Sequence, residues 1–398
     1  MRIAIVTESF APDVNGVAHS VVRTVEHLLR RGHQPLVVAP ASAGPVPPPA
    51  SAGPLPAPAS AGSAEAPDAS QDCPVIRVPS IALPGYRGFR LGLPSPKLGE
   101  ALAEHAPDVL HLASPFVLGG RAATLAAQRR LPTLAVYQTD MAAYARAYGM
   151  AWGEAAAWRR LRAIHNSAHR TLAPSTAAAT DLVDHGIERV WLWRRGVDTA
   201  RFDPAKRHEE LRRALAPNGE LLVGYVGRLA AEKRVELLAE TCRLPGVRVV
   251  VVGDGPARRE IERALPGALF LGLRQGNQLA RLYASLDLFA HTGPHETFGQ
   301  TIQEAQASGL PVIAPAAGGP TDLITPGVTG VLVPPGDGPA IAAAVARLAA
   351  DRPLRESYGR AARTGVAGRS WAAVGDELID HYRAVLAAEP PATLRPAA

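Results

Sequence analysis

Short apolar runs alternate with longer stretches of helical periodicity along nearly the whole chain. In the first half the runs lie at residues 2–8, 35–39, 108–113, 133–138 and 171–174, and helical stretches cover 16–31 and 118–130. In the second half the runs lie at 221–227, 247–252, 268–272, 286–292, 311–316 and 330–333. Strands that alternate with helices are typical of parallel sheets with helices on both faces. The pattern therefore predicts an α/β protein.

The alternation breaks near residues 194–204 and then resumes. We therefore predict two Rossmann-like domains that face a cleft. The first covers residues 1–195, the second covers 196–370, and a helix with a tail follows over 371–398. Ligands of such folds bind at the carboxyl ends of the strands, so we expect the chemistry in the loops that follow the strands.

Residues 41–72 interrupt the first series with a degenerating nine-residue repeat: ASAGPVPPP, ASAGPLPAP and ASAGSAEAP. A stretch of Pro, Ala, Ser and Gly cannot bury enough apolar surface to order itself. We predict a disordered surface insertion in the N-terminal domain. A partner that recognises proline-rich segments is the alternative.

Composition narrows the class of protein. The chain has 398 residues, of which 47% are hydrophobic, so it is not a wholly disordered protein. Two cysteines exclude a disulfide-stapled scaffold. No apolar run reaches the ~18–20 residues that span a bilayer, and the N-terminus does not have the pattern of a secretion signal. We expect a cytoplasmic protein.

Basic residues exceed acidic ones by 42 to 36, and only three of the 42 are lysines. Codon bias explains the excess of arginine, and so does a surface built to bind phosphate, because the planar guanidinium matches that geometry. The isoelectric point of about 9.6 is compatible with anionic lipid or nucleic acid and does not choose between them.

The most informative stretch, residues 291–311, holds Glu296 just before a predicted helix and Glu304 about two turns into it. The helix is expected to begin near 297–299. Eight residues of helix span roughly 12 Å, more than the ~5–9.5 Å between the paired carboxyl groups of glycosidases. The two carboxylates therefore suit opposite ends of one extended ligand, such as a sugar and a ribose with phosphate between them. The alternative is an acid at the helix N-terminus and a solvated surface acid.

Arg228 and Lys233 lie in the loop that follows the apolar run at 221–227. Both can converge on a diphosphate and neutralise the charge that develops as it leaves. A solvated basic loop explains the same residues equally well.

Gly253 lies in the turn Gly-Asp-Gly-Pro after the next run and resembles half of a dinucleotide fingerprint. Arg258 stands where the third glycine belongs, and no acidic residue ends the following strand, so NAD is disfavoured. The turn can still allow another nucleotide to approach the backbone closely. The alternative is a simple tight glycine turn.

In the first half, Asn15-Gly16 and the stretch Tyr-Gln-Thr-Asp at 137–140 each follow a strand and would line the cleft. Aromatic residues interleaved with arginines come next: Tyr144, Arg146, Tyr148, Trp152, Trp158, Arg159, Arg160 and Arg162. Such a stretch can lie on an anionic membrane surface or hold a lipid acceptor. Helices with a core face and a charged rim are the more common origin.

Together these motifs resemble those of the retaining glycosyltransferases of family 4, over nearly the whole chain apart from 41–72 and the last residues. To the motifs above are added Arg-Gly-Val-Asp-Thr-Ala-Arg-Phe at 195–202 and Gly-Arg-Leu-Ala-Ala-Glu-Lys at 227–233. The stretches at 293–300 and 316–320 are most similar to GDP-mannose-dependent α-mannosyltransferases that act on lipids such as phosphatidylinositol or glucuronosyl diacylglycerol. The resemblance implies the GT-B fold, with the last helix crossing back to the N-terminal domain.

The resemblance also implies roles for residues of the second half. Arg228 and Lys233 would bind the donor diphosphate and stabilise it as the leaving group. Glu296 would contact the sugar hydroxyls, assisted by the amides of Phe298 and Gly299. Glu304 would bind the ribose hydroxyls.

Other assignments follow from the same resemblance. The amide of Gly16, next to Asn15, would touch the diphosphate when the cleft closes, and Arg274 would border the base. Many relatives have histidine where this chain has Gln138, which leaves Asp140 as the expected polar participant.

The implied reaction is mannose transfer from GDP-mannose to a lipid or glycolipid, with the α configuration retained and with no metal and no cofactor besides the donor. No Asp-x-Asp motif occurs. The alternative is transfer from a UDP-sugar to a lipid or a small soluble acceptor. An epimerase, a phosphorylase and a polyanion binder are competing classes, and no nucleic-acid partner is expected. Peripheral contact with the inner face of the cytoplasmic membrane is a further expectation.

Overall fold

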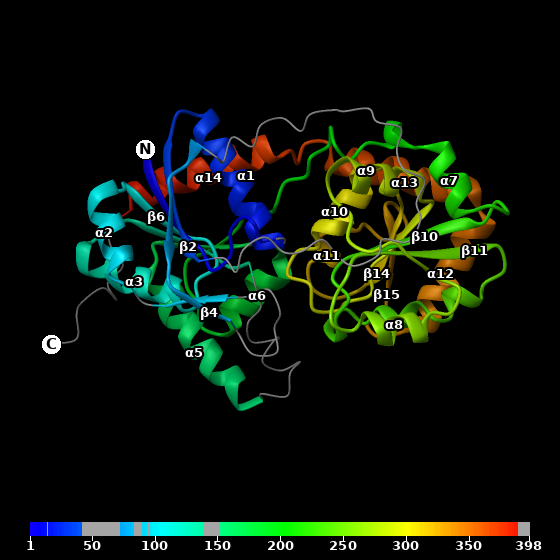
Figure 1. Cartoon of the computed structure of the whole chain (residues 1–398), viewed down its shortest axis with the longest axis horizontal. Helices are drawn as coiled ribbons and strands as arrows, with labels where there is room; N and C mark the ends of the chain where they lie inside the picture. The colour runs from blue at the N-terminus through cyan, green and yellow to red at the C-terminus, as the bar shows by residue number, and fades with distance from the viewer. Residues whose placement is uncertain (14, 42–71, 83–89, 94, 139–150, 389–398) are drawn as a thin grey trace. The chain divides into compact units, whose positions relative to one another are not determined.

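The computed structural model describes residues 1–388 except 14, 42–71, 83–89, 94 and 139–150 (Figure 1). Almost all of the predicted insertion at 41–72 therefore lies outside the described residues, as does Asp140. The described chain divides into two compact units. One holds the residues up to Arg195 together with those from Trp371 onward, and the other holds Gly196–Ser370.

The first unit is built on a seven-stranded parallel sheet in the order β3-β2-β1-β6-β7-β8-β9. The strands are β1 (Arg2–Val6), β2 (Gln34–Pro40), β3 (Val75–Val78), β6 (Val109–Leu112), β7 (Thr133–Val136), β8 (Arg170–Ala173) and β9 (Val190–Leu192). Along β1, Ile3 and Ile5 join one apolar cluster, whereas Ala4 and Val6 join another. Both faces of the sheet are therefore buried, which explains the continuous apolar runs.

Helices cover each face of this sheet. The cluster on one face includes residues of α1 (Gly16–Arg30) and α14 (Trp371–Leu386). The cluster on the other includes residues of α2 (Pro96–His105), α3 (Leu118–Arg129) and α5 (Ala151–Ser167). The helix α6 (Thr176–Asp184) lies between β8 and β9 in the chain, and β4 (Ser80–Ala82) pairs with β5 (Arg90–Gly92) in a small antiparallel hairpin.

The last helix, α14, belongs to the first unit although it follows the whole second unit in the chain. It lies beside α1 (Figure 1). The indole Nε1 of Trp193 donates to the carbonyl of Val374 at 3.0 Å, and His27 Nε2 lies 2.9 Å from Asp376 Oδ1. Tyr382 is fully buried, with its hydroxyl 2.7 Å from His111 Nδ1. The predicted return of this helix is confirmed.

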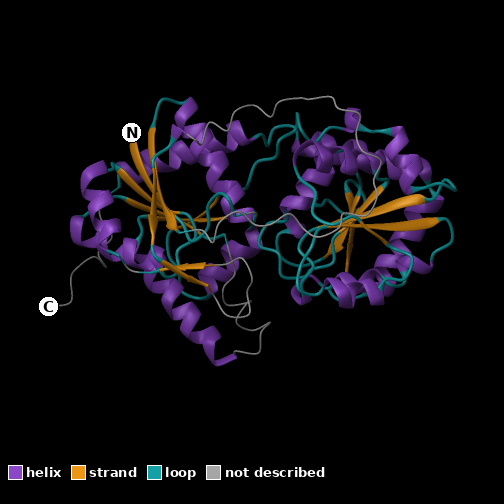
Figure 2. Ribbon diagram, viewed as in Figure 1, coloured by secondary structure: helices purple, strands orange, loops and turns teal. Residues whose placement is uncertain are grey.

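The second unit contains a six-stranded parallel sheet in the order β12-β11-β10-β13-β14-β15. The strands are β10 (Leu221–Val226), β11 (Val247–Val252), β12 (Leu269–Phe270), β13 (Leu288–Ala290), β14 (Val312–Pro315) and β15 (Gly330–Val333). Helices lie on both sides of it (Figure 2). They are α7 (Glu209–Leu215), α8 (Arg258–Ala264), α9 (Gly276–Ser285), α10 (Gln300–Ala307), α11 (Pro320–Leu323), α12 (Gly338–Ala350) and α13 (Arg352–Val366).

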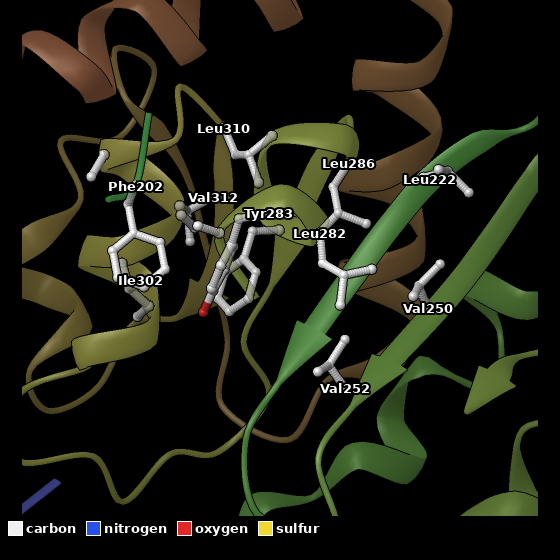
Figure 3. Packing of buried hydrophobic residues seen from close by; sticks show 14 of the residues in the cluster. Phe202, Leu222, Val250, Val252, Leu282, Tyr283, Leu286, Ile302, Leu310 and Val312 are labelled. Carbon is white, nitrogen blue, oxygen red and sulfur yellow. The ribbon is translucent and has the colours of Figure 1, made fainter. Parts of the chain in front are cut away.

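Alternate residues of the strands enter two clusters here as well. Leu222 packs with Leu282, Leu286 and Val312 on the face shown in Figure 3, whereas Val223 joins the cluster on the other face. The predicted α/β fold with two parallel sheets is thus confirmed. No helix among the described residues is long and apolar enough to cross a bilayer.

Candidate active site

The loops after β10 and β11 pack against each other at the carboxyl end of the second sheet. Gly253 has a φ of +138°, and a Cβ there would lie 1.9 Å from the Gly227 carbonyl oxygen. A Cβ at Gly255 would lie 2.2 Å from the carbonyl oxygen of Leu229. Both positions therefore require glycine for loop packing. A nucleotide contact at Gly253 remains a prediction.

Lys233, in the loop after β10, and Glu296, in the loop after β13, form an ion pair. Nζ of Lys233 lies 2.9 Å from Oε2 of Glu296, and each side chain is 21% exposed. The hydroxyl of Thr292 donates to the Lys233 carbonyl at 2.6 Å. Burial lowers the pKa of Lys233, but the Glu296 carboxylate more than offsets this, so that the pKa lies above its usual value. The ammonium is therefore fully charged at neutral pH.

Arg228 also has an acidic neighbour, which the sequence reasoning missed. Its Nη1 lies 3.9 Å from Oε1 of Glu232, whose side chain is 8% exposed. Neither carboxylate oxygen of Glu232 accepts a hydrogen bond from the described residues. The acid lies four residues after Arg228 and next to Lys233, and that spacing is the signal that could have identified it.

A glycine turn fixes the backbone of the loop that carries Glu296. The amide of Gly319 donates to the Glu296 carbonyl at 2.7 Å. A Cβ at Gly319 would lie 2.1 Å from the Phe298 carbonyl oxygen, and one at Gly318 would lie 2.5 Å from that of Glu296. The turn at 316–320, which the sequence analysis used only as part of the family resemblance, thus packs directly against the loop of Glu296.

The helix α10 begins at Gln300, one to three residues later than predicted. Gly299 precedes it with a φ of +102°, a conformation that favours glycine. Phe298 is 1% exposed and packs into the protein. The two residues therefore have structural roles, and the donor contacts of their amides remain predictions.

Glu304 is buried, so the interpretation as a solvated surface acid is wrong. Its side chain is on α10 and the residue is 8% exposed, with Oε2 lying 3.2 Å from the hydroxyl of Tyr283. Burial raises the pKa of Glu304 to about 8, although the Tyr283 hydroxyl and the charge of Arg201 lower it. The carboxyl is thus largely protonated at neutral pH in the free protein.

His291 lies near the ion pair, with Nε2 3.9 Å from Oε2 of Glu296. It is 3% exposed, and burial lowers its pKa to about 4. The ring is therefore neutral at physiological pH and adds no charge to the site.

In the first unit, Asn15 caps α1. Its Oδ1 accepts from the amides of Val17 and Ala18 at 3.0 Å, and its Nδ2 donates to Ser9 Oγ at 2.7 Å. The next residue, Gly16, is held through its carbonyl by Arg195, which donates from Nη1 at 3.1 Å.

Arg195 is 7% exposed and also donates from Nη2 to Gln138 Oε1 at 2.9 Å. It therefore joins Gln138 to the Gly16 turn within one unit. The sequence reasoning assigned this arginine no role.

Arg274 lies in the loop between β12 and α9, where its Nη1 donates to the carbonyl of its neighbour Leu273 at 3.0 Å. That bond is within its own loop and does not bring it to Arg228, Lys233 or Glu296. Its place beside the base remains a prediction.

In its described part, the stretch rich in aromatic residues and arginines has a buried tryptophan and exposed arginines. Trp158 is 7% exposed and stacks on His185, with the ring centroids 3.6 Å apart. Arg159, Arg160 and Arg162 are exposed on the same helix. Tyr144, Arg146 and Tyr148 lie outside the described residues.

Comparisons with known proteins agree with this architecture. The model "Glycosyltransferase Family 4" matches residues 14–201, and the model "Glycosyl transferases group 1" matches residues 206–365. A GDP-mannose-dependent alpha-mannosyltransferase of Mycobacterium tuberculosis is 48% identical over 386 residues, which cover 97% of each chain. The protein of the same name from Mycolicibacterium smegmatis is 47% identical over 387 residues, 97% of this chain and 98% of its own.

Among solved structures, sucrose-phosphate synthase from Thermosynechococcus elongatus superimposes with a TM-score of 0.76 at 23% sequence identity. The match covers 98% of this chain and 100% of that one. It confirms the GT-B fold, and the relatives confirm that the chain is a sugar-transferring enzyme. The chain belongs to glycosyltransferase family 4.

Proposed function

We propose that this enzyme transfers mannose from GDP-mannose to a lipid or glycolipid acceptor and retains the α configuration. The observation that carries the proposal is the pairing of Lys233 with Glu296 beside Arg228 at the end of the second sheet. Relatives that are 47–48% identical over almost their whole length carry the name of a GDP-mannose-dependent alpha-mannosyltransferase, which supports this donor.

In the proposed reaction, the bond between the anomeric carbon and the donor diphosphate breaks while a bond to the acceptor oxygen forms on the same face. The acceptor proton passes to the departing diphosphate. Arg228 and Lys233 stabilise the negative charge on the leaving group, a preorganised electrostatic effect. The ionised Glu296 accepts hydrogen bonds from sugar hydroxyls and orients the ring. We propose that these two cations suffice without a metal.

A transfer assay tests the donor and the metal together. Purified protein, a membrane lipid extract, a chelator and one labelled sugar nucleotide at a time are combined, and label is followed into organic solvent. Labelled lipid from GDP-mannose alone supports the proposal. Label from a UDP-sugar would overturn the donor and favour the alternative, label only without chelator would overturn metal independence, and label only in soluble products would overturn the lipid acceptor.

We further propose that the enzyme acts at the inner face of the cytoplasmic membrane as a peripheral protein. The exposed arginines of α5 beside the buried Trp158 support this, because guanidinium groups pair with anionic head groups. Liposome flotation tests it. Binding to vesicles with anionic lipid but not to neutral ones is expected, and absence from both lipid fractions would contradict the proposal.

A further inference from the structure

Tyr283 is a completely buried tyrosine on α9 whose hydroxyl reaches the next helix of the chain. Its ring packs edge-on against Phe202, with the centroids 5.5 Å apart, and tilted against Phe289 at 5.6 Å. Figure 3 shows its oxygen directed toward the side on which Ile302 lies. The aromatic packing fixes the ring, so the position of the hydroxyl is set by the core.

That hydroxyl has one proton and two acceptors. The Tyr283 oxygen lies 3.2 Å from the Thr301 carbonyl and 3.2 Å from Oε2 of Glu304. If Glu304 is protonated, it can donate to Tyr283 while Tyr283 donates to Thr301, and both contacts are hydrogen bonds. If Glu304 is ionised, the carbonyl and the carboxylate compete for one proton. The Tyr283 hydroxyl can therefore contact the Glu304 carboxyl in both states, as an acceptor from the protonated form and as a donor to the ionised form.

We propose that Tyr283 positions the Glu304 carboxyl for donor binding, and that nucleotide binding ionises Glu304. The inference rests on the proposed role of Glu304 in binding the ribose of the donor. Two ribose hydroxyls would donate hydrogen bonds that an ionised Glu304 lacks in the free protein, so they stabilise the ionised form. Tyr283 acts through Glu304 and is a positioning residue.

Among the described residues, Arg201 is the charged group that acts on the pKa of Glu304. Arg201 acts on it electrostatically and pairs with Asp198 at 3.6 Å. The other titratable or charged groups on neighbouring elements include Tyr225 on β10, Arg281 on α9, Asp322 on α11, and Arg363 on α13, which donates to the Ala307 carbonyl at 2.6 Å and pairs with Asp203. Of these, Arg201 favours the ionised form, so it assists the change on binding.

Proton release measures the proposed ionisation. GDP is titrated into the full-length protein at pH 7.5 in two buffers of different ionisation enthalpy. Wild type is expected to release up to about one proton more than Glu304→Gln, which cannot ionise. Equal release by the two proteins would overturn the proposed ionisation.

Tyr283→Phe tests the positioning role, because it removes the hydroxyl and keeps the ring. We expect the donor KM to rise roughly three- to tenfold, the usual range for one lost hydrogen bond, with kcat at saturating donor nearly unchanged. The pH at which the donor KM changes should move upward, because the ionised Glu304 loses a donor. An unchanged KM and pH profile would overturn the role.

Two controls separate positioning from damage to the fold. Tyr382→Phe removes the hydroxyl of another fully buried tyrosine, in the first unit, and should leave the donor KM unchanged. In a Glu304→Gln background, Tyr283→Phe should have no further effect on the donor KM. The same rise in both backgrounds would show a merely structural role and overturn the proposal.

Failure of the inference differs from failure of the proposed function. If Glu304→Gln leaves the donor KM unchanged, Glu304 is not a donor ligand and the inference falls, whereas the proposed mannose transfer, tested by the labelled-donor assay, stands. If that variant raises KM and Tyr283→Phe does not, only the inference falls. If wild type binds UDP and not GDP, the proposed donor falls, and the same series with UDP decides the inference.

Discussion

Lys233 and Glu296 form an ion pair at the carboxyl end of the second sheet. Both side chains are mostly buried, so removal of one leaves the charge of the other buried without this partner. A second pair of opposite charges lies in the same loop as Lys233, where Arg228 faces Glu232. The carboxylates of Glu296 and Glu232 offset the repulsion between Lys233 and Arg228 when no sugar nucleotide is bound. The free protein thus keeps both cations in place before the substrate arrives.

Lys233→Ala and Glu296→Ala should each reduce kcat by at least about a hundredfold, the range seen when one electrostatic stabiliser of a transition state is lost. Circular dichroism should show an intact fold. Lys206→Ala is the matched control, because that lysine lies in the same unit and its hydrogen bond to Asn277 is exposed to solvent. Wild-type activity in either site variant would refute the assignment.

Glu304 should make the donor-free protein less stable as the pH rises. Its pKa in the folded state is about 8 against an ordinary value of 4.5, so between these values the unfolded chain loses the proton and the folded protein keeps it. Stability then falls with increasing pH, by up to a few kcal/mol across the interval.

Thermal unfolding at pH 5, 6, 7 and 8 checks this expectation. Glu304→Gln should gain stability relative to wild type as the pH rises. The comparison removes the contributions of His291 and the other titrating groups, which both proteins share. A difference in Tm that does not vary with pH would contradict the raised pKa.

At the scale of elements, the site depends on how closely backbone segments approach each other. Gly319 has an ordinary φ of −55°, yet a Cβ would overlap the Phe298 carbonyl. The constraint is therefore space and not backbone conformation. It links the turn before α11 to the loop that carries Glu296.

Gly319→Ala should lower both Tm and transfer, because the loop of Glu296 must shift to admit the methyl group. A cost of roughly 1–3 kcal/mol is expected from such overpacking. Gly365→Ala is the control, since that exposed glycine on α13 has no neighbouring atom within 4 Å of the place that a Cβ would occupy. The control should be neutral or slightly stabilising, and equal losses in both variants would contradict the explanation.

The sequence predicted elements where one physical signal dominates. The run at 247–252 was predicted and is found, because a strand buried on both faces is apolar throughout. The hairpin of β4 and β5 was missed, since each strand has only three residues. The apolar run at 286–292 is longer than its strand, because burial continues into the loop after Ala290.

The candidate site was predictable in its charged motif residues and not in their neighbours. Glycine and charge spacing after apolar runs indicates Arg228, Lys233 and Glu296 from the sequence alone. Tyr283 reads as an ordinary core residue of an amphipathic helix, because a hydroxyl that reaches another helix leaves no local pattern. The burial of Glu304 likewise depends on which face of α10 meets α9, which is a tertiary property.

At the scale of the whole molecule, the first unit is completed by the end of the chain. Five side chains of α14 are buried in the apolar cluster of the first sheet: Val374, Leu378, Ile379, Tyr382 and Val385. At about 1.5–3 kcal/mol each, their burial contributes on the order of 10 kcal/mol. That is comparable to the whole stability of a typical domain.

A fragment of residues 1–195 should therefore fail to fold stably and should aggregate, whereas a fragment of residues 196–370 should give a cooperative unfolding transition. Circular dichroism and size-exclusion chromatography of the two fragments check this. A monomeric, cooperatively unfolding fragment 1–195 would contradict the proposed contribution of α14.

The return of α14 also imposes an order on folding during synthesis. The ribosome makes residues 196–386 after the strands of the first sheet have emerged, which takes roughly 10–40 s at ordinary elongation rates. Through that interval the apolar face that α14 will cover stays open to water, and the second unit has all of its own strands before α14 is made. The later-made unit can thus mature before the earlier one, and the nascent N-terminal half is the part of this protein that most needs a chaperone.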